Sequence, residues 1–123
     1  MSKNYSMIAI EWLMFVERAE GITIRHALSN DGEMVINDPD LLTEKTKKPK
    51  KYHVDGYCAE NNTIYEFYGD VVHGNIYINQ SDFFQKKYDK TKKREDRLRE
   101  LGFGVVVMWK ADWVMIRQLL GSG

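Results

Sequence analysis

The chain has 123 residues, of which 43% are hydrophobic, 12% aromatic and 29% charged, a composition typical of one globular domain. No apolar run reaches the roughly 18 residues of a membrane span, no basic and apolar leader opens the sequence, and a single cysteine excludes an internal disulfide. We therefore expect a single domain over residues 1–120 in a reducing, cytoplasmic setting, without membrane contact.

The net charge of zero hides a strong polarity along the chain. Residues 1–44 carry a net charge of −5, whereas residues 45–51 and 86–99 together carry +10. A basic surface beside an acidic one suits a protein that holds a polyanion near a metal ion. The simpler alternative is that both basic runs are solvated faces.

Hydrophobic periodicity and turn residues divide the chain into helices and strands. In chain order they predict a helix at 5–20, two hairpin strands at 22–28 and 33–36, a mobile basic loop at 37–51, strands at 52–58 and 63–69, an irregular connection at 74–81, a basic helix at 82–101, a strand at 105–109, a helix at 112–120 and a flexible tail at 121–123. This order predicts an α/β (α+β) fold in which helices flank a central mixed β-sheet.

Some of these elements carry further expectations. Gly21 ends the first helix, and Ser81 or Asp82 caps the basic helix. The continuous apolar run at 105–109 predicts a strand buried on both faces. The segment 37–51 contains two prolines and little apolar material, which is typical of a loop.

Two carboxylates, Asp55 and, eleven residues later, Glu66, lie in strand-like sequence. Burying an anion is costly unless it is paired or binds a cation, so two carboxylates on adjacent strands suggest a shared metal. Oxygen ligands suit Mg²⁺ or Mn²⁺. The alternative is a polar strand surface, because antiparallel sheets often keep one face in water.

Three further residues extend this pattern. Strand alternation puts Asp70 on the same side as Glu66, and His73 follows where the strand gives way to a loop. Glu11 is a lone carboxylate in the apolar stretch of the first helix. Taken alone, His73 is more commonly a structural histidine, and Glu11 an exposed helix residue.

Four other residues have two interpretations each. His26 and Glu33 either line the site or serve the turn beside them. Trp109 and Trp113 are expected in the core rather than as platforms for stacked bases.

Five segments carry a family resemblance: Ala9-Ile-Glu-Trp-Leu13, Val54-Asp-Gly-Tyr57, Tyr65-Glu-Phe-Tyr-Gly-Asp-Val-Val-His-Gly74, Arg94-Glu95, and Leu98-Arg-Glu-Leu-Gly-Phe-Gly-Val-Val-Val-Met-Trp109. They resemble the very-short-patch repair endonucleases and their phage homing-endonuclease relatives, within the PD-(D/E)XK nuclease superfamily. The likeness covers about residues 9–110, and its most specific part runs from Asp55 to Gly74. In particular, the chain resembles the catalytic domain of EDxHD-type homing endonucleases.

The resemblance implies a restriction-endonuclease-like core and Mg²⁺-dependent hydrolysis of DNA phosphodiester bonds. It also implies site roles for six residues: Asp55 as the central metal ligand, Glu66 as the acid of the second core strand, the backbone carbonyl of Phe67 as a further ligand, Glu11 as a holder of the metal or its waters, Asp70 as the aspartate of the homing-enzyme variant, and His73 as the histidine that assists hydrolysis.

Two features depart from this family. Tyr68 stands where the superfamily has a lysine, or the repair enzymes a histidine, and this leaves open which group polarises the water. Cys58 alone cannot build the structural zinc site of the repair enzymes. Mismatch-repair specificity is therefore disfavoured, and we expect no zinc.

Basic side chains of the loop and the long helix are expected to contact phosphates, which position DNA without specifying its sequence. They are Lys47, Lys48, Lys50, Lys51, Lys86, Lys87, Lys90, Lys92, Lys93, Arg94 and Arg97. The expected partners are double-stranded DNA, a second subunit in a homodimer that cuts both strands, and a DNA-targeting domain outside this chain, in a phage- or bacterium-encoded protein. The alternatives are a catalytically silent DNA-binding module with the nuclease fold, and a repair nuclease that acts on branched DNA or on RNA.

Overall fold

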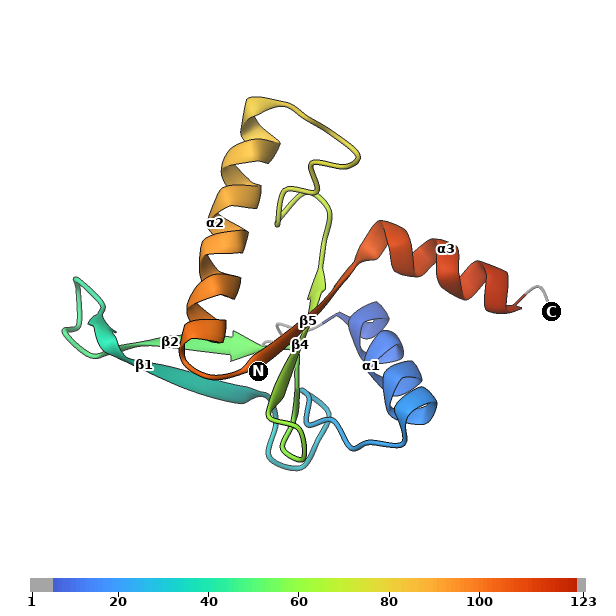
Figure 1. Ribbon diagram of the computed structural model, residues 1–123, viewed down its shortest axis with the longest axis horizontal. Coiled ribbons are helices and arrows are strands. Elements are labelled where there is room, and N and C mark those ends of the chain that lie inside the picture. Colours follow the sequence, from blue (N-terminus) through green and yellow to red (C-terminus); the bar gives the residue numbers. More distant parts are fainter. Residues whose placement is uncertain (1–5, 122–123) are drawn as a thin grey trace. The chain divides into compact units, whose positions relative to one another are not determined.

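The computed structural model describes residues 6–121. In chain order the elements are α1 (Met7–Glu20), β1 (Met34–Leu42), β2 (Pro49–Val54), β3 (Gly56–Cys58), β4 (Thr63–Tyr68), α2 (Asp82–Glu100), β5 (Gly104–Trp109) and α3 (Lys110–Gly121) (Figure 1). Strands β1 and β2 form one sheet, and a second sheet has the strand order β3-β4-β5. The α+β expectation is confirmed at this level, while the restriction-endonuclease-like core stays a prediction.

The chain forms two compact units, the first ending at Tyr65 and the second beginning at Glu66. The boundary falls within β4. Each unit has buried apolar side chains of its own, among them Leu13 in the first and Leu98 in the second. The prediction of a single domain therefore stays a prediction.

In the first unit, helix α1 buries an apolar face as predicted, but two methionines of the predicted stripe, Met7 and Met14, are exposed. Its buried residues are Ala9, Ile10, Trp12, Leu13 and Val16. Gly21 ends the helix in the left-handed conformation, with φ of 66°, and its amide donates to the carbonyl of Glu17. The Trp12 ring meets Tyr65 edge to face, with the ring centres 6.2 Å apart.

The segment predicted as a mobile basic loop at 37–51 is instead part of an antiparallel hairpin. β1 pairs with β2 so that Ile36 lies opposite Tyr52, and the register shifts between Asp38 and Leu42. Ile36 and Tyr52 are buried, and so is Asp38, whose carboxylate accepts from the Tyr52 hydroxyl at 3.1 Å. The Tyr52 hydroxyl thus allows Asp38 to be buried within a strand whose polar sequence is typical of a loop.

The predicted hairpin between 22–28 and 33–36 is wrong. Arg25 makes an isolated antiparallel bridge with Tyr57 instead. Its guanidinium donates to the carbonyls of Asp31, Gly32 and Glu33 at 2.8–3.2 Å. The intervening segment is thus a turn tied together by one arginine, and 33–36 enters β1.

The predicted strand 52–58 divides at Asp55, where the chain bends between β2 and β3. β3 pairs with β4 in antiparallel register, with Gly56 opposite Tyr65. A Cβ atom on Gly56 would approach side-chain atoms of Ile24 and Leu13 to 2.7 and 2.8 Å. Glycine is therefore needed here for close packing, and β4 itself agrees with its prediction.

In the second unit, α2 and α3 flank β5 along the chain (yellow to red in Figure 1). Ser81 caps α2, since its hydroxyl accepts from the amide of Phe84 at 3.3 Å. Four buried residues of α2 recur at helical spacing: Phe84, Thr91, Glu95 and Leu98. Two of them, Thr91 and Glu95, are polar. As predicted for the core, Trp113 is buried. Trp109 is half-buried and packs edge to face on Tyr68, with the ring centres 5.1 Å apart.

Two predictions for the C-terminal segment need correction. Strand β5 is not buried on both faces, because Val106 remains 42% exposed. Among residues 6–121, β5 is an edge strand, with β4 as its neighbour. Gly121, predicted in the flexible tail, is the last residue of α3, and the rest of that tail lies outside the described residues.

Candidate functional site

The second unit gathers buried polar side chains between β4 and α2. Glu66 on β4 is 3% exposed and forms an ion pair with Arg94 of α2. A carboxylate out of water is costly unless its charge is compensated, and the guanidinium supplies that compensation. The strand alternation that brings Glu66 to this side also brings Tyr68, two residues further on.

Tyr68 is buried and donates its hydroxyl proton to Glu95 Oε2 at 2.8 Å. Burial and the neighbouring Glu95 carboxylate both raise the pKa of Tyr68, so the hydroxyl stays protonated. Glu95 Oε1 accepts from Lys92 and Arg99, at 3.1 and 3.3 Å. The hydrogen bond that Lys92 donates to Glu95 raises the pKa of Lys92. Tyr68, at the position where the resemblance implies a basic residue, thus donates to a carboxylate held by two cations.

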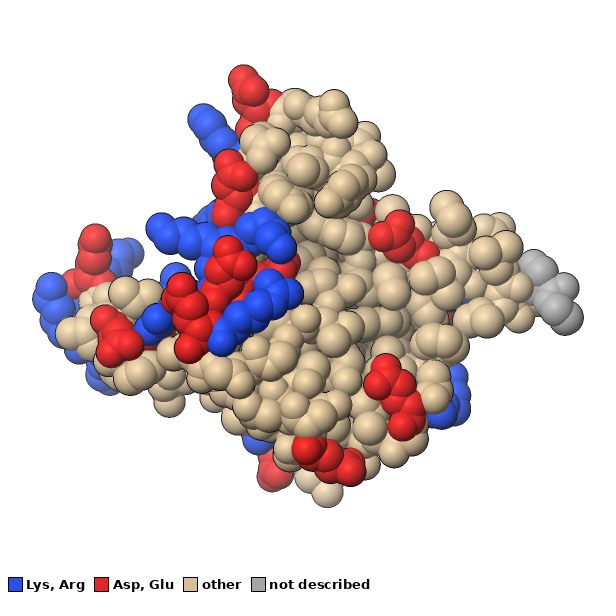
Figure 2. Space-filling view, viewed as in Figure 1, with Lys and Arg blue, Asp and Glu red and all other residues tan. Residues whose placement is uncertain are grey.

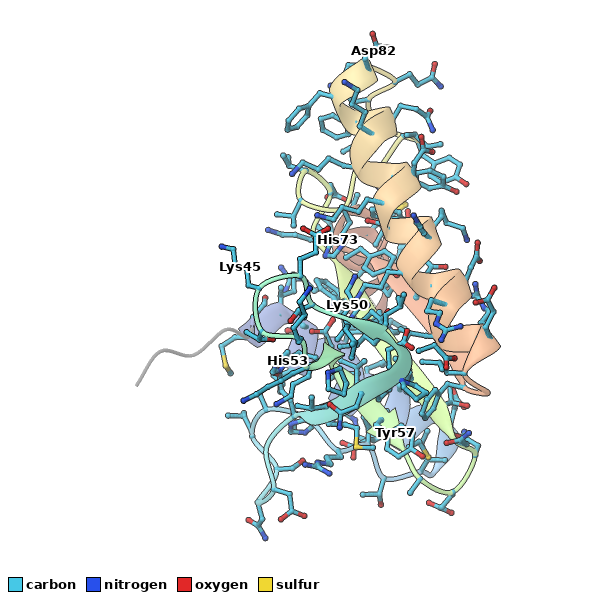
Figure 3. The ribbon with its side chains drawn as sticks, turned by 90° about the vertical axis from the view of Figure 1, so that its left-hand side faces the viewer. Lys45, Lys50, His53, Tyr57, His73 and Asp82 are labelled. Carbon is cyan, nitrogen blue, oxygen red and sulfur yellow. The ribbon has the colours of Figure 1, made fainter. Side chains whose placement is uncertain are left out.

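His73 lies beside this cluster and is half-buried. Its ring stacks on Tyr68, with the centres 4.4 Å apart and an angle of 24° between the planes. The Thr91 hydroxyl of α2 donates to the backbone carbonyl of His73 at 3.1 Å and lies 3.4 Å from Nδ1 (His73 is labelled in Figure 3). Burial first, and then the positive charge of Arg94, lower the pKa of His73. The imidazole is therefore neutral at pH 7.

Asp70 lies in the turn after β4, where its carboxylate accepts one hydrogen bond from a side chain and one from the backbone. Its Oδ1 accepts from Asn75 Nδ2 at 2.9 Å and from the amide of Ala111 at 3.3 Å. Ala111 is in the first turn of α3, whose amides have no partner within the helix. These contacts give Asp70 a structural role in addition to the catalytic role that the resemblance implies.

The other predicted site residues are distributed over both units. Asp55 lies half-buried in the bend before β3, and Glu11 is exposed on α1, both in the first unit. Phe67 is 7% exposed within β4. The structure thus brings Glu66 and His73 against α2, while the first unit holds Asp55 and Glu11.

The predicted DNA-binding residues are mostly exposed. The lysines at 47, 48, 50 and 51 lie on β2 and the turn before it, and Figure 3 labels Lys45 in that turn and Lys50 on β2. Along α2, Lys86, Lys87, Lys90 and Lys93 are exposed, and Figure 2 shows basic and acidic side chains interspersed there. The two arginines are half-buried, and Arg97 pairs with Glu100 at 3.2 Å.

Two residues of this cluster were not predicted as site residues: Thr91 was not singled out, and Glu95 was quoted only in the Arg94-Glu95 segment of the resemblance, without a role. Both continue the inward spacing of Phe84 and Leu98 along α2. A polar residue on the buried stripe of a helix needs a partner inside the protein, and this signal could have identified both.

His26 and Glu33 serve the turn region. His26 Nδ1 accepts from the amide of Leu28 at 3.1 Å, and Glu33 lies 3.7 Å from His53 of β2. The turn interpretation is the one that these contacts support.

Comparisons with protein-family models, with curated proteins and with solved structures found no match for this chain. Over residues 6–121, no three His, Cys, Asp or Glu side chains converge as a metal-binding group. In the same part of the chain, no helix is long and apolar enough to cross a membrane.

Proposed function

We propose that this chain is a metal-dependent DNA endonuclease, the catalytic domain of a homing endonuclease that hydrolyses phosphodiester bonds. The observation that carries the proposal is the buried Glu66 of β4, set against a basic helix and followed by Asp70 and His73. Acidic, basic and imidazole groups so close in sequence are the elements of phosphodiester hydrolysis.

The donor set has the chemistry of a magnesium site. Mg²⁺ is bound through one or two carboxylates together with water and substrate phosphate, so it does not require three protein side chains. Asp55 lies in the bend before β3, in the first unit, and Glu66 lies on β4 where the second unit begins. In the proposal, these two carboxylates and the carbonyl of Phe67 hold the ion, and Glu11 holds its waters.

Bound there, Mg²⁺ or Mn²⁺ would polarise the scissile phosphate and lower the pKa of a coordinated water. The chain's own residues supply the remaining functions. A neutral His73 accepts a proton from water. Asp70 holds the turn after β4 in which His73 also lies. Lysines of α2 and of the β1–β2 hairpin bind phosphates. A homodimer and a DNA-targeting domain outside this chain complete double-strand cleavage at a chosen sequence.

The second candidate is a catalytically silent DNA-binding module. The Glu66–Arg94 ion pair favours it, because an arginine already compensates the charge that a metal would otherwise neutralise. Tyr68 favours it too, since its hydroxyl donates to Glu95. Such a module would keep salt-sensitive binding to DNA but would not cut it. A repair nuclease acting on branched DNA or on RNA is the third candidate.

Cleavage of supercoiled plasmid, with Mg²⁺ and with EDTA, tests the proposal. The wild type should nick or linearise the plasmid only with Mg²⁺, and Asp55→Asn and Glu66→Gln should each slow cutting by at least about 100-fold. The matched control is Glu60→Gln, which removes an exposed carboxylate in the turn between β3 and β4 and should cut normally.

Other results of the plasmid experiment would support one of the other candidate functions or a different set of ligands. Salt-sensitive binding without cutting by the wild type would favour the silent module or a nuclease domain that needs its missing targeting partner. Normal cutting by Asp55→Asn would show that the assigned ligand is wrong. Competition between plasmid, branched DNA and RNA for the wild type identifies the preferred substrate.

A further inference from the structure

The hydroxyl of Thr91 contacts two atoms of His73, its backbone carbonyl oxygen and its ring nitrogen Nδ1. Thr91 is 7% exposed on α2, and its Oγ1 is 3.1 Å from the carbonyl oxygen and 3.4 Å from Nδ1 of His73. A buried hydroxyl with both contacts on the same histidine constrains where the protons of that histidine lie.

Proton counting decides the arrangement. A threonine hydroxyl has one proton to donate and lone pairs with which to accept. The carbonyl of His73 can only accept, so it takes the hydroxyl proton. Toward Nδ1, Thr91 then offers only an acceptor, which a protonated Nδ1 satisfies.

We infer that Thr91 is a positioning residue that keeps the neutral ring of His73 protonated on Nδ1 and leaves the lone pair of Nε2 available as a base. The inference rests on the proposed function, in which His73 accepts a proton during hydrolysis. It adds a residue from α2 to that site, and it assigns the nitrogen that acts.

Two neighbours keep the ring in place for this task. Tyr68 stacks on one face of the imidazole at 4.4 Å, which restricts its rotation. Gly74, with φ of 70°, brings the chain after His73 so close to α2 that a Cβ there would lie 2.7 Å from the Cβ of Lys87. The pKa of His73 is lowered, which keeps the ring in the neutral form that has two tautomers.

Nitrogen NMR of the ¹⁵N-histidine-labelled full chain tests the inference without relying on cleavage. Long-range proton–nitrogen spectra at about pH 8 distinguish the Nδ1–H from the Nε2–H tautomer. The chain has three histidines, and His73→Gln assigns the signal of the third. The expected result for the wild type is the Nδ1–H tautomer, whereas free imidazole side chains favour Nε2–H.

Two substitutions separate the hydroxyl from the packing. Thr91→Val keeps the shape of the side chain but removes its acceptor, and it should move His73 toward the Nε2–H tautomer. Thr91→Ser keeps the hydroxyl and should retain Nδ1–H. An Nε2–H tautomer in the wild type, or an unchanged tautomer in Thr91→Val, would overturn the inference, and the first needs no variant to fold.

Cleavage kinetics then connect the tautomer to the reaction. Thr91→Val should lower the plateau rate of plasmid cutting by about 10-fold, and Thr91→Ser should restore most of it. If the tautomer behaves as expected but the wild type does not cut DNA, the proposed function fails while the assignment of the ring nitrogen stands. An unchanged plateau in a Thr91→Val protein whose tautomer has moved would show that Nε2 is not the base.

Discussion

The buried carboxylate of Glu66 and the guanidinium of Arg94 form a pair whose members differ in exposure. The Glu66 side chain is 4% exposed, whereas that of Arg94 is 29% exposed. Water therefore solvates the arginine better than the carboxylate. Removing the arginine, which leaves the buried charge in place, should cost more than removing the carboxylate.

We expect Arg94→Met to lower the free energy of unfolding by about 2–4 kcal/mol, since it removes the guanidinium that pairs with the buried Glu66 carboxylate. The double variant Glu66→Leu/Arg94→Met should recover most of that loss, because two apolar side chains replace two charges. Urea denaturation measures both. Arg97→Met is the control and should cost less than Arg94→Met, because its ion-pair partner Glu100 is 65% exposed and stays hydrated when the arginine is lost. A double variant no better than Arg94→Met would contradict this account.

His73 should make the stability of the fold depend on pH. Its pKa lies below the ordinary value of 6.5, because burial and Arg94 disfavour the imidazolium in the folded state. The unfolded chain therefore binds more protons as the pH falls through 6.5, and the unfolding free energy decreases toward the folded-state pKa.

Denaturation at about pH 7.5 and about pH 5 measures this dependence. His73→Asn should remove a part of the acid-side loss, because the side chain that protonates more readily in the unfolded chain is gone. Equal slopes in wild type and His73→Asn would mean that the folded and unfolded states protonate His73 alike.

At the scale of elements, Gly74 marks the contact between the turn after β4 and α2. A Cβ atom there would meet the Phe84 carbonyl oxygen and the Tyr88 amide nitrogen, which are backbone atoms of α2 and cannot move aside. Gly74 also has φ of 70°, which disfavours any other residue.

Gly74→Ala should therefore lower the free energy of unfolding by about 2–5 kcal/mol, through the clash and the backbone strain together. Gly102→Ala separates the two, because Gly102 has φ of 104° but no atom within 4 Å of a Cβ. It should cost about 1–2 kcal/mol. Gly69→Ala has neither feature and should change little. Thermal and urea melting of the three variants give the comparison, and equal losses at positions 74 and 102 would exclude the clash.

Elements with strong local signals were predictable from the sequence. The apolar stripe of α1 ends at Gly21, the serine cap opens α2, and β4 is rich in aromatic and β-branched residues. The β1–β2 hairpin was not, since its polar sequence shows no strand pattern. Asp38 is accommodated there by the hydroxyl of Tyr52, fourteen residues away, which local sequence cannot reveal.

The candidate site was predictable to a similar degree. Glu66 and His73 are unusual in an apolar segment, so the sequence alone draws attention to them. Their partners on α2, among them Thr91 and Glu95, are polar residues within a charged helix and become distinctive only through burial. Tertiary pairing decides which charges of α2 face inward, and the sequence does not contain that pairing in local form.

At the scale of the whole molecule, the zero net charge is divided between two basic segments and an acidic N-terminal third. On α2, Lys86, Lys90 and Lys93 share one helical stripe, distinct from the buried stripe that contains Thr91 and Glu95. Acidic residues of the same helix lie close to these lysines and reduce its net field. The hairpin lysines follow one another with no acid between them.

The salt dependence of DNA binding tests whether these lysines contact phosphates. Each phosphate contact contributes about 0.9 to the slope of log affinity against log salt, so a triple alanine variant at Lys86, Lys90 and Lys93 should reduce the slope by about 3. A triple variant at Lys47, Lys48 and Lys51 should do the same. Fluorescence anisotropy with a labelled duplex at several salt concentrations measures the slope, and Lys110→Ala, an exposed lysine outside both segments, is the control. A slope unchanged in both triple variants would show that the basic runs are solvated faces, because lysines that release no counterions touch no phosphate.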